Sequence, residues 1–281
     1  MTMSNEAQRY TRVLSIAGSD SGGGAGIQAD LKTFAALGCY GMTAITALTA
    51  QNTLGVSGIH GVPPEMLKAQ LSAVLDDIGV DAVKIGMLHA PDIVRTVAWA
   101  LRHYEVKQVV LDPVMVATSG DRLIAPDTVQ VLVDELFPLA TVVTPNLDEA
   151  ALLLGRPIGD ADELETAARD LLALGAKAVL LKGGHLPGDE VADLLVSGAG
   201  PAQRLASPRI ASRNTHGTGC TLSSAIAAYL ALGNPLDQAV AKARSYILQA
   251  IAMGANVYTG AGHGPLNHGH APLALHKRPR G

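Results

Sequence analysis

Short runs of valine, isoleucine and leucine recur along this chain, each followed by a turn and a stretch of helical periodicity. This alternation constrains the fold most, because it is typical of repeated β-α units around a parallel sheet that is buried on both faces. The expected parallel strands are residues 12–17, 40–48, 82–86, 108–114, 141–145 and 178–182, and the expected antiparallel additions are residues 191–196 and 203–210. We therefore predict an α/β fold with a mostly parallel central sheet.

Helical periodicity is clearest over residues 27–37, where Ile27, Leu31, Phe34 and Ala35 fall on one face. A second apolar stripe follows Gly219, and a final long helix is expected from about residue 235 to about residue 256. These stretches supply helices to cover the sheet.

Composition favours one large domain. Of the 281 residues, 48% are hydrophobic and 16% are charged, a balance that can bury a large core. We expect a single domain over residues 12–265, a flexible N-terminal segment over residues 1–11 and a C-terminal tail over residues 266–281, mobile at its basic residues 277–280.

Charge and cysteine content exclude several classes of protein. The net charge of −4 argues against a protein that coats nucleic acid or an anionic membrane. The two cysteines, Cys39 and Cys220, form no disulfide framework. The polar start of the chain lacks the apolar segment of a secretory signal, and no apolar run is long enough to span a bilayer. We expect a cytoplasmic protein with a small-molecule partner.

A glycine-rich loop, residues 18–26, follows the first predicted strand and precedes a helix, where backbone amides can hold an anion. Its spacing excludes three known motifs. A dinucleotide fingerprint fails at Ile27, a P-loop fails at Gly24 where a lysine is needed, and a hydrolase elbow fails at Asp20 where a serine is needed. We favour a ligand-contacting loop over a plain flexible turn.

A second loop, residues 214–220, opens the helix after Gly219, and its glycines Gly217 and Gly219 let successive amides converge on an anion. Such a group of amides could stabilise a transferring phosphoryl group. Because helix N-termini lower the pKa of thiols, Cys220 is a candidate thiolate or proton acceptor. A small buried apolar role is the alternative for this cysteine.

Polar residues follow three other strands. Asp112 and the pair Asp148 and Glu149 could provide oxygen ligands for Mg²⁺, although for the latter two, in the first turn of a helix, we favour a capping role on the residues alone. Lys182 ends an apolar run, where burial requires an anionic partner such as a phosphate or an aspartate.

The histidines are expected to be secondary. His263, His268 and His270 lack the other ligands of a zinc site, so we expect a loop that contacts the site at most. His216 lies in the second loop, but the glycines and not the imidazole explain an anion site there.

Seven ordered segments together resemble one family: residues 16–32, 45–52, 84–87, 111–115, 144–149, 181–185 and 214–220. The chain resembles the hydroxymethylpyrimidine/phosphomethylpyrimidine kinases of thiamine biosynthesis, a branch of the ribokinase-like fold. The resemblance implies a three-layer α/β/α sandwich, ATP and Mg²⁺ as cofactors, and a homodimer.

The resemblance also implies site roles. Gln51 matches the residue that hydrogen-bonds the aminopyrimidine, Ala25 and Met87 match walls of the ring pocket, and Asp20 is placed on the substrate side, with a turn-forming role as its alternative. The turn with Gly217 and Gly219 matches the anion hole, and Cys220 matches the catalytic base.

On the nucleotide side, Lys182 matches a lysine near the phosphates, and Asn146 and Thr215 match nucleotide contacts. Asp112 and Glu149, with Asn146, match the residues that organise Mg²⁺ and its waters. The implied reaction is ATP-dependent phosphorylation of 4-amino-5-hydroxymethyl-2-methylpyrimidine to its monophosphate and then its diphosphate. Pyridoxal as acceptor is the alternative, and a non-catalytic pyrimidine sensor is a third reading.

Overall fold

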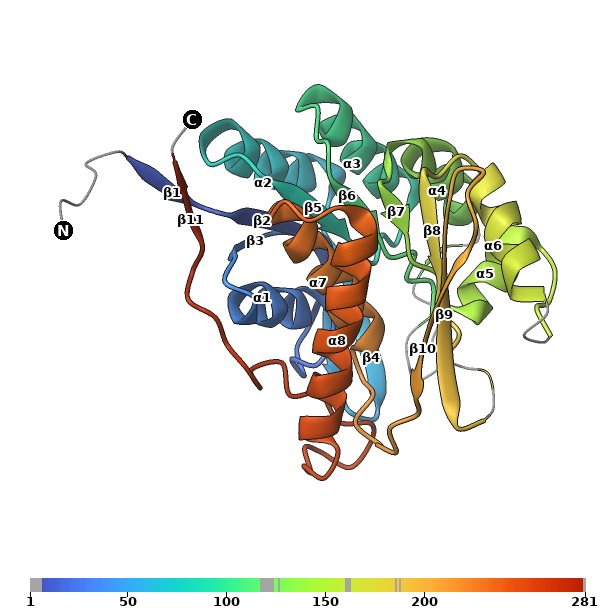
Figure 1. Ribbon diagram of the computed structural model, residues 1–281. Coiled ribbons are helices and arrows are strands. Elements are labelled where there is room, and N and C mark those ends of the chain that lie inside the picture. Colours follow the sequence, from blue (N-terminus) through green and yellow to red (C-terminus); the bar gives the residue numbers. More distant parts are fainter. Residues whose placement is uncertain are drawn as a thin grey trace.

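The computed structural model describes residues 7–116, 124–125, 127–159, 163–184, 186 and 188–279. Its main feature is a nine-stranded sheet with the order β10-β9-β8-β7-β6-β5-β2-β3-β4 (Figure 1). The strands are β2 (Arg12–Asp20), β3 (Tyr40–Asn52), β4 (Gly55–Gly61), β5 (Ala82–Ile85), β6 (Val109–Leu111), β7 (Val142–Val143), β8 (Ala178–Leu181), β9 (Glu190–Ser197) and β10 (Gln203–Pro208).

The six strands from β3 to β8 in the sheet order run parallel, and β4, β9 and β10 are antiparallel additions at the two edges. This confirms the predicted mostly parallel sheet and the antiparallel placement of β9 and β10. Strand β4 was not predicted, because its glycines and exposed side chains give no apolar run. Strands β2 and β3 also extend beyond their apolar runs, to Asp20 and Asn52.

Helices cover both faces of the sheet, which confirms the three-layer arrangement (Figure 1). One face carries α2 (Pro64–Asp77), α3 (Pro91–His103), α4 (Thr128–Leu136), the short 3₁₀ helix η1 (Phe137–Leu139), α5 (Leu147–Leu154) and α6 (Leu164–Ala173). The other face carries α1 (Gly26–Ala36), α7 (Thr218–Ala231) and α8 (Leu236–Gly254).

Five of the six parallel strands contribute to both cores because successive side chains point to opposite faces, and β3 contributes Met42 and Ala44 to the core under α2 to α6 only. In β6, Val109 and Leu111 belong to the core under α2 to α6, and Val110 belongs to the core under α1, α7 and α8. This two-sided burial explains why the strands are continuous apolar runs.

The two ends of the described chain differ from the prediction of a flexible start and a mobile tail. Strand β1 (Gln8–Tyr10) pairs antiparallel with β11 (Lys277–Pro279). The segment before β11 crosses α1, with the His276 amide donating to the Gly38 carbonyl at 2.7 Å. Residues 1–6, 280 and 281 of the predicted flexible segments lie outside the described residues.

His268 explains part of this attachment. It is buried, its Nε2 lies 3.0 Å from the Thr221 hydroxyl, and its carbonyl accepts a hydrogen bond from Tyr246 at 2.6 Å. Burial lowers the pKa of His268 to about 4, so it packs as a neutral side chain. Within the described part of the chain, no group of three or more His, Cys, Asp or Glu residues could hold a metal, and no helix combines the length and apolarity needed to cross a membrane.

Helix α2 offers a test of the core. Leu67 is 0% exposed and its neighbour Met66 is 55% exposed. We expect Leu67→Ala to lower the free energy of unfolding by about 2–5 kcal/mol, because it leaves a cavity, and Met66→Ala to change it by no more than about 0.5 kcal/mol. Urea unfolding monitored by circular dichroism measures both. Equal effects of the two substitutions would contradict this packing of α2.

Candidate active site

A cavity of about 750 Å³ opens at the carboxyl ends of the parallel strands, where ligands bind in open α/β sheets. The structure brings every site residue named from the sequence to the wall of this cavity: Asp20, Ala25, Gln51, Met87, Asp112, Asn146, Glu149, Lys182, Thr215, Gly217, Gly219 and Cys220. Residues at or just after the ends of β2, β3, β5, β6, β7 and β8 thus share one space with the second loop.

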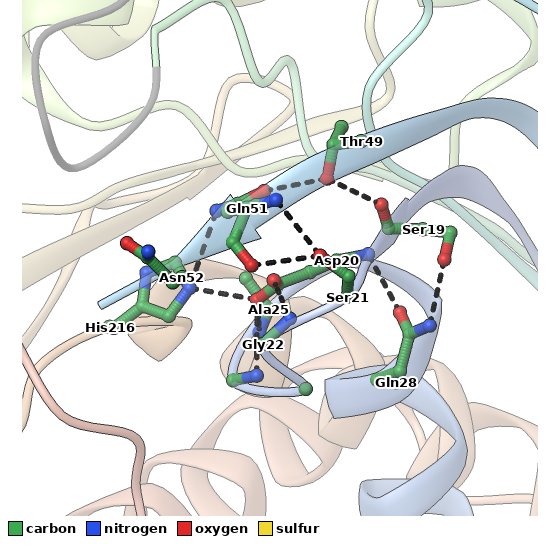
Figure 2. A network of polar contacts seen from close by, with 12 residues as sticks. Ser19, Asp20, Ser21, Gly22, Ala25, Gln28, Thr49, Gln51, Asn52 and His216 are labelled. Carbon is green, nitrogen blue, oxygen red and sulfur yellow. Dashed lines mark hydrogen bonds and ion pairs between the residues drawn. The ribbon is translucent and has the colours of Figure 1, made fainter. Parts of the chain in front are cut away.

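Asp20 organises the first loop. Its buried carboxylate accepts hydrogen bonds from the backbone amides of Gly22 at 2.8 Å, Gly24 at 3.1 Å and Ala25 at 2.8 Å, and lies 2.8 Å from His216 Nε2 (Figure 2). Burial alone would raise the pKa of Asp20, but the hydrogen bond to His216 and those to the backbone hold it below its ordinary value. Its carboxylate therefore shapes the loop, which agrees with the turn-forming alternative.

His216 joins the two predicted loops, a role that the sequence did not reveal. Its Nε2 contacts Asp20 of the first loop and lies 3.4 Å from Nε2 of Gln51, at the end of β3 (Figure 2). A Cβ atom added to Gly24 would lie 2.5 Å from the His216 ring, so the glycine permits this close packing. The His216 imidazole, and not only the glycines, is therefore a structural part of the site.

Three charged side chains form a cluster in the cavity. Lys182 Nζ donates to Asp112 Oδ1 at 2.9 Å and lies 3.9 Å from Glu149 Oε2. Burial alone would raise the pKa of Asp112, but Lys182 holds it below its ordinary value. Burial raises the pKa of Glu149 to about 7, although Lys182 opposes this. The predicted anionic partner of Lys182 is therefore an aspartate in the protein itself.

Asn146 and Glu149 also form the capping box of α5. The Asn146 side chain accepts from the Glu149 amide at 2.9 Å, and the Glu149 side chain accepts from the Asn146 amide at 2.7 Å. Capping is thus confirmed for Glu149. Because Mg²⁺ is usually held by one or two carboxylates together with substrate phosphates, the neighbouring carboxylates of Asp112 and Glu149 fit a shared magnesium site.

The N-terminus of α7 faces this cluster. Gly217 has a φ of 85°, and a Cβ there would overlap the Gly24 carbonyl, so only glycine fits. A Cβ on Gly219 would lie 3.2 Å from Lys182 Nζ, which shows how closely the turn approaches the lysine. Converging amides and a lysine at a helix N-terminus favour a bound anion.

Cys220 lies in the first turn of α7 and is half-buried. Burial raises the pKa of its thiol to about 11, although Lys84 and a hydrogen bond from the Gly26 amide act in the opposite direction. The prediction that the helix N-terminus lowers the thiol pKa is therefore wrong for the ligand-free protein. Cys220 is a neutral thiol at pH 7.

Two ion pairs beside the cavity were not predicted as site features. Lys84 and Asp30 are both fully buried and bonded at 2.9 Å. Arg244 donates to Asp193 at 2.7 Å, and Asp193 accepts from the Gly183 amide at 3.0 Å, next to Lys182. The sequence does contain a feature that could have identified Lys84, because this charged residue stands inside an otherwise apolar strand.

A helix N-terminus with a nearby lysine and an uncharged amide in the wall of one cavity suit the transfer of a phosphoryl group to a small polar ring. The comparisons agree with this class. Residues 20–267 match the phosphomethylpyrimidine kinase family. The chain belongs to this family and is a phosphotransferase.

Two curated relatives are more than half identical to this chain. The hydroxymethylpyrimidine/phosphomethylpyrimidine kinase of Rhizobium meliloti is 55% identical over 258 residues, which cover 92% of this chain and 96% of that protein. The thiamine biosynthesis bifunctional protein ThiED of Geobacter sulfurreducens is 56% identical over 256 residues, 91% of this chain but only 52% of that protein. The chain thus spans about half the length of this second relative.

Among solved structures, an ADP complex of Bacillus subtilis pyridoxal kinase matches with a TM-score of 0.85 and 40% identity, covering 92% of this chain and 98% of that one. This match confirms the ribokinase-like fold, and its bound ADP supports the use of ATP by a kinase of this shape.

The Asp20 hydrogen bonds predict a pH dependence of stability. Because the pKa of Asp20 is lowered in the folded chain, its contribution to stability is present above the unfolded pKa and is lost as the pH falls through the folded one. We expect Asp20→Asn to lower the free energy of unfolding by about 1–3 kcal/mol at pH 7, and this difference to narrow below pH 4. Urea unfolding across pH measures it.

The matched control is Asp92→Asn in α3, whose side chain is 75% exposed. Asp92→Asn should change the free energy of unfolding little, both at pH 7 and below pH 4. A constant difference between wild type and Asp20→Asn at all pH values would contradict the role assigned to the Asp20 carboxylate.

Proposed function

We propose that this chain transfers the γ-phosphoryl group of ATP to the hydroxymethyl group of 4-amino-5-hydroxymethyl-2-methylpyrimidine, and then a second one to the resulting monophosphate. The observation that carries the proposal is the shared cavity, which is lined by the Gln51 amide, the α7 N-terminus and Lys182. The similarity to the hydroxymethylpyrimidine/phosphomethylpyrimidine kinase of Rhizobium meliloti supports the same acceptor.

The acceptor ring would bind between Gln51, Ala25 and Met87. The carboxamide of Gln51 offers one donor and one acceptor, which match the ring nitrogen and amino group of an aminopyrimidine. Met87 is buried and supplies an adaptable apolar wall. These contacts leave the hydroxymethyl group to reach the α7 N-terminus.

Charge stabilisation would come from the backbone amides near Gly217 and Gly219 and from Lys182. These groups are fixed before the substrate binds, which is how enzymes lower the barrier of phosphoryl transfer without reorganisation. Asp112 and Glu149 would hold Mg²⁺ with the phosphates, where the ion neutralises phosphate charge. Asn146 and Thr215, which line the same cavity, would contact the nucleotide.

Cys220 would accept the proton of the acceptor hydroxyl. At pH 7 a thiol with a pKa of about 11 is almost entirely protonated, so the reactive thiolate is a small fraction of the enzyme. That fraction grows tenfold with each pH unit below the pKa. The proton-acceptor role of Cys220 therefore predicts that kcat depends on pH.

Pyridoxal is the second candidate acceptor, favoured by the 40% identity to the Bacillus subtilis pyridoxal kinase. A non-catalytic sensor is disfavoured because Lys182, Glu149 and Cys220 are all in the cavity. A homodimer stays a prediction from the family resemblance, and a cytoplasmic location stays a prediction from the sequence.

The proposal is tested by incubating the purified chain with Mg·ATP and either the pyrimidine or pyridoxal. We expect mass spectrometry to detect the pyrimidine monophosphate first and the diphosphate later. A metal-chelated reaction is the control and should give neither product. Phosphate on pyridoxal alone would overturn the assignment of the acceptor.

The proton-acceptor role predicts that Cys220→Ala lowers kcat by about 10²- to 10⁴-fold. Between pH 7 and 9 the wild-type kcat should rise by up to about tenfold per pH unit, because the thiolate fraction rises. Cys220→Asp should regain part of the activity and lose this slope, since a carboxylate is already ionised at pH 7.

Circular dichroism and thermal melts of each variant separate lost chemistry from lost folding. Near-wild-type turnover in folded Cys220→Ala would remove the cysteine from the mechanism.

A further inference from the structure

The carboxamide of Gln51 lies between two polar neighbours. Its Oε1 position is 3.0 Å from the Thr49 hydroxyl, and its Nε2 position is 3.4 Å from His216 Nε2 (Figure 2). A rotation of 180° about the last side-chain bond exchanges the amide oxygen and nitrogen without changing the shape of the group. The protons on its neighbours therefore decide which end is which.

Thr49 fixes one end. Its hydroxyl lies 2.7 Å from the Ser19 carbonyl, which can only accept a hydrogen bond. A hydroxyl has one proton, and Thr49 donates that proton to the Ser19 carbonyl. Toward Gln51 the Thr49 oxygen is then an acceptor, so the amide atom 3.0 Å away must be the nitrogen.

His216 fixes the other end independently. Its Nε2 lies 2.8 Å from the Asp20 carboxylate. This carboxylate also accepts hydrogen bonds from three backbone amides, and it has no proton to donate. The Nε2 atom must therefore carry a proton. An amide NH₂ group facing it would place two donors together, so the Gln51 atom 3.4 Å away must be the oxygen.

We propose that Thr49 and the Asp20–His216 pair hold the Gln51 carboxamide with its nitrogen toward Thr49 and its oxygen toward His216, and that this orientation selects the donor and acceptor pattern of the acceptor ring. Thr49, Asp20 and His216 are thus positioning residues that act through Gln51. The proposal rests on the proposed function, in which Gln51 contacts the ring.

The consequence is a specificity rule. An aminopyrimidine presents a ring nitrogen that accepts and an amino group that donates, in a fixed order along its edge. Its 4-oxo analogue presents a ring N–H that donates and a carbonyl that accepts, in the reverse order. An amide held in one orientation pairs with the first in the pose that directs the hydroxymethyl group to the α7 N-terminus. It opposes the second in the same pose.

The experiment compares kcat/KM for the aminopyrimidine and for its 4-oxo analogue. Thr49→Val removes the hydroxyl and keeps the shape, so one of the two contacts that set the amide orientation is lost. Thr49→Ser keeps the hydroxyl. Ser57→Ala removes the hydroxyl of an exposed β4 residue that donates to the Ala50 carbonyl and not to the Gln51 side chain.

We expect the ratio of the two kcat/KM values to fall about 10-fold or more in Thr49→Val, as the loss of one orienting hydrogen bond implies. The ratio should stay near the wild-type value in Thr49→Ser and Ser57→Ala, and KM for ATP should not change. An equal loss on both rings, or an unchanged ratio in Thr49→Val, would overturn the proposal.

A second readout does not depend on catalysis. The side-chain NH₂ signals of Gln51 in ¹⁵N NMR, assigned by their loss in Gln51→Leu, should show one proton with slow solvent exchange in wild type and Thr49→Ser. That protection should vanish in Thr49→Val. If wild type phosphorylates neither ring, the proposed function fails, and this signal alone decides the orientation: identical signals in wild type and Thr49→Val contradict it.

Discussion

The buried ion pair between Lys84 and Asp30 links the elements on which the site is built. Lys84 belongs to β5 and Asp30 to α1, and Asp30 also accepts hydrogen bonds from Ser15 of β2 at 2.5 Å and Ser224 of α7 at 2.6 Å. A buried charge is tolerated only when it is paired and fully hydrogen-bonded. The relative positions of β2, β5, α1 and α7 are therefore fixed by one set of charges and hydroxyls, just below the cavity.

Much of the fold was predictable from sequence because two-sided burial gives apolar runs. The six parallel strands and the antiparallel strand β9 each coincide with such a run, whereas the edge strand β10 lies within its predicted range but is largely exposed. Strand β4 and the pair β1 and β11 were missed for the opposite reason. They lie at edges, bury little, and are held by backbone hydrogen bonds that leave no trace in residue type.

For the site, sequence predicted which residues meet but not how they bond. Residues at the ends of parallel strands converge by topology, so their meeting follows from the fold. The bond between Asp20 and His216 joins residues 196 positions apart, and no local pattern encodes it. The thiol of Cys220 was misjudged because the helix terminus is visible in the sequence and the burial that outweighs it is not.

The pairing of β1 with β11 brings positions 8 and 279 together beside the start of β2, whose other end, at Asp20, forms part of the cavity wall (Figure 1). Positions 8 and 279 therefore lie near the end of the sheet where β2 begins, opposite the end that borders the cavity. Such a domain is an architecture suited to gene fusion. A fusion partner joined at position 8 or 279 would therefore be attached away from the cavity, and a short linker between these two positions would suit a circular permutant.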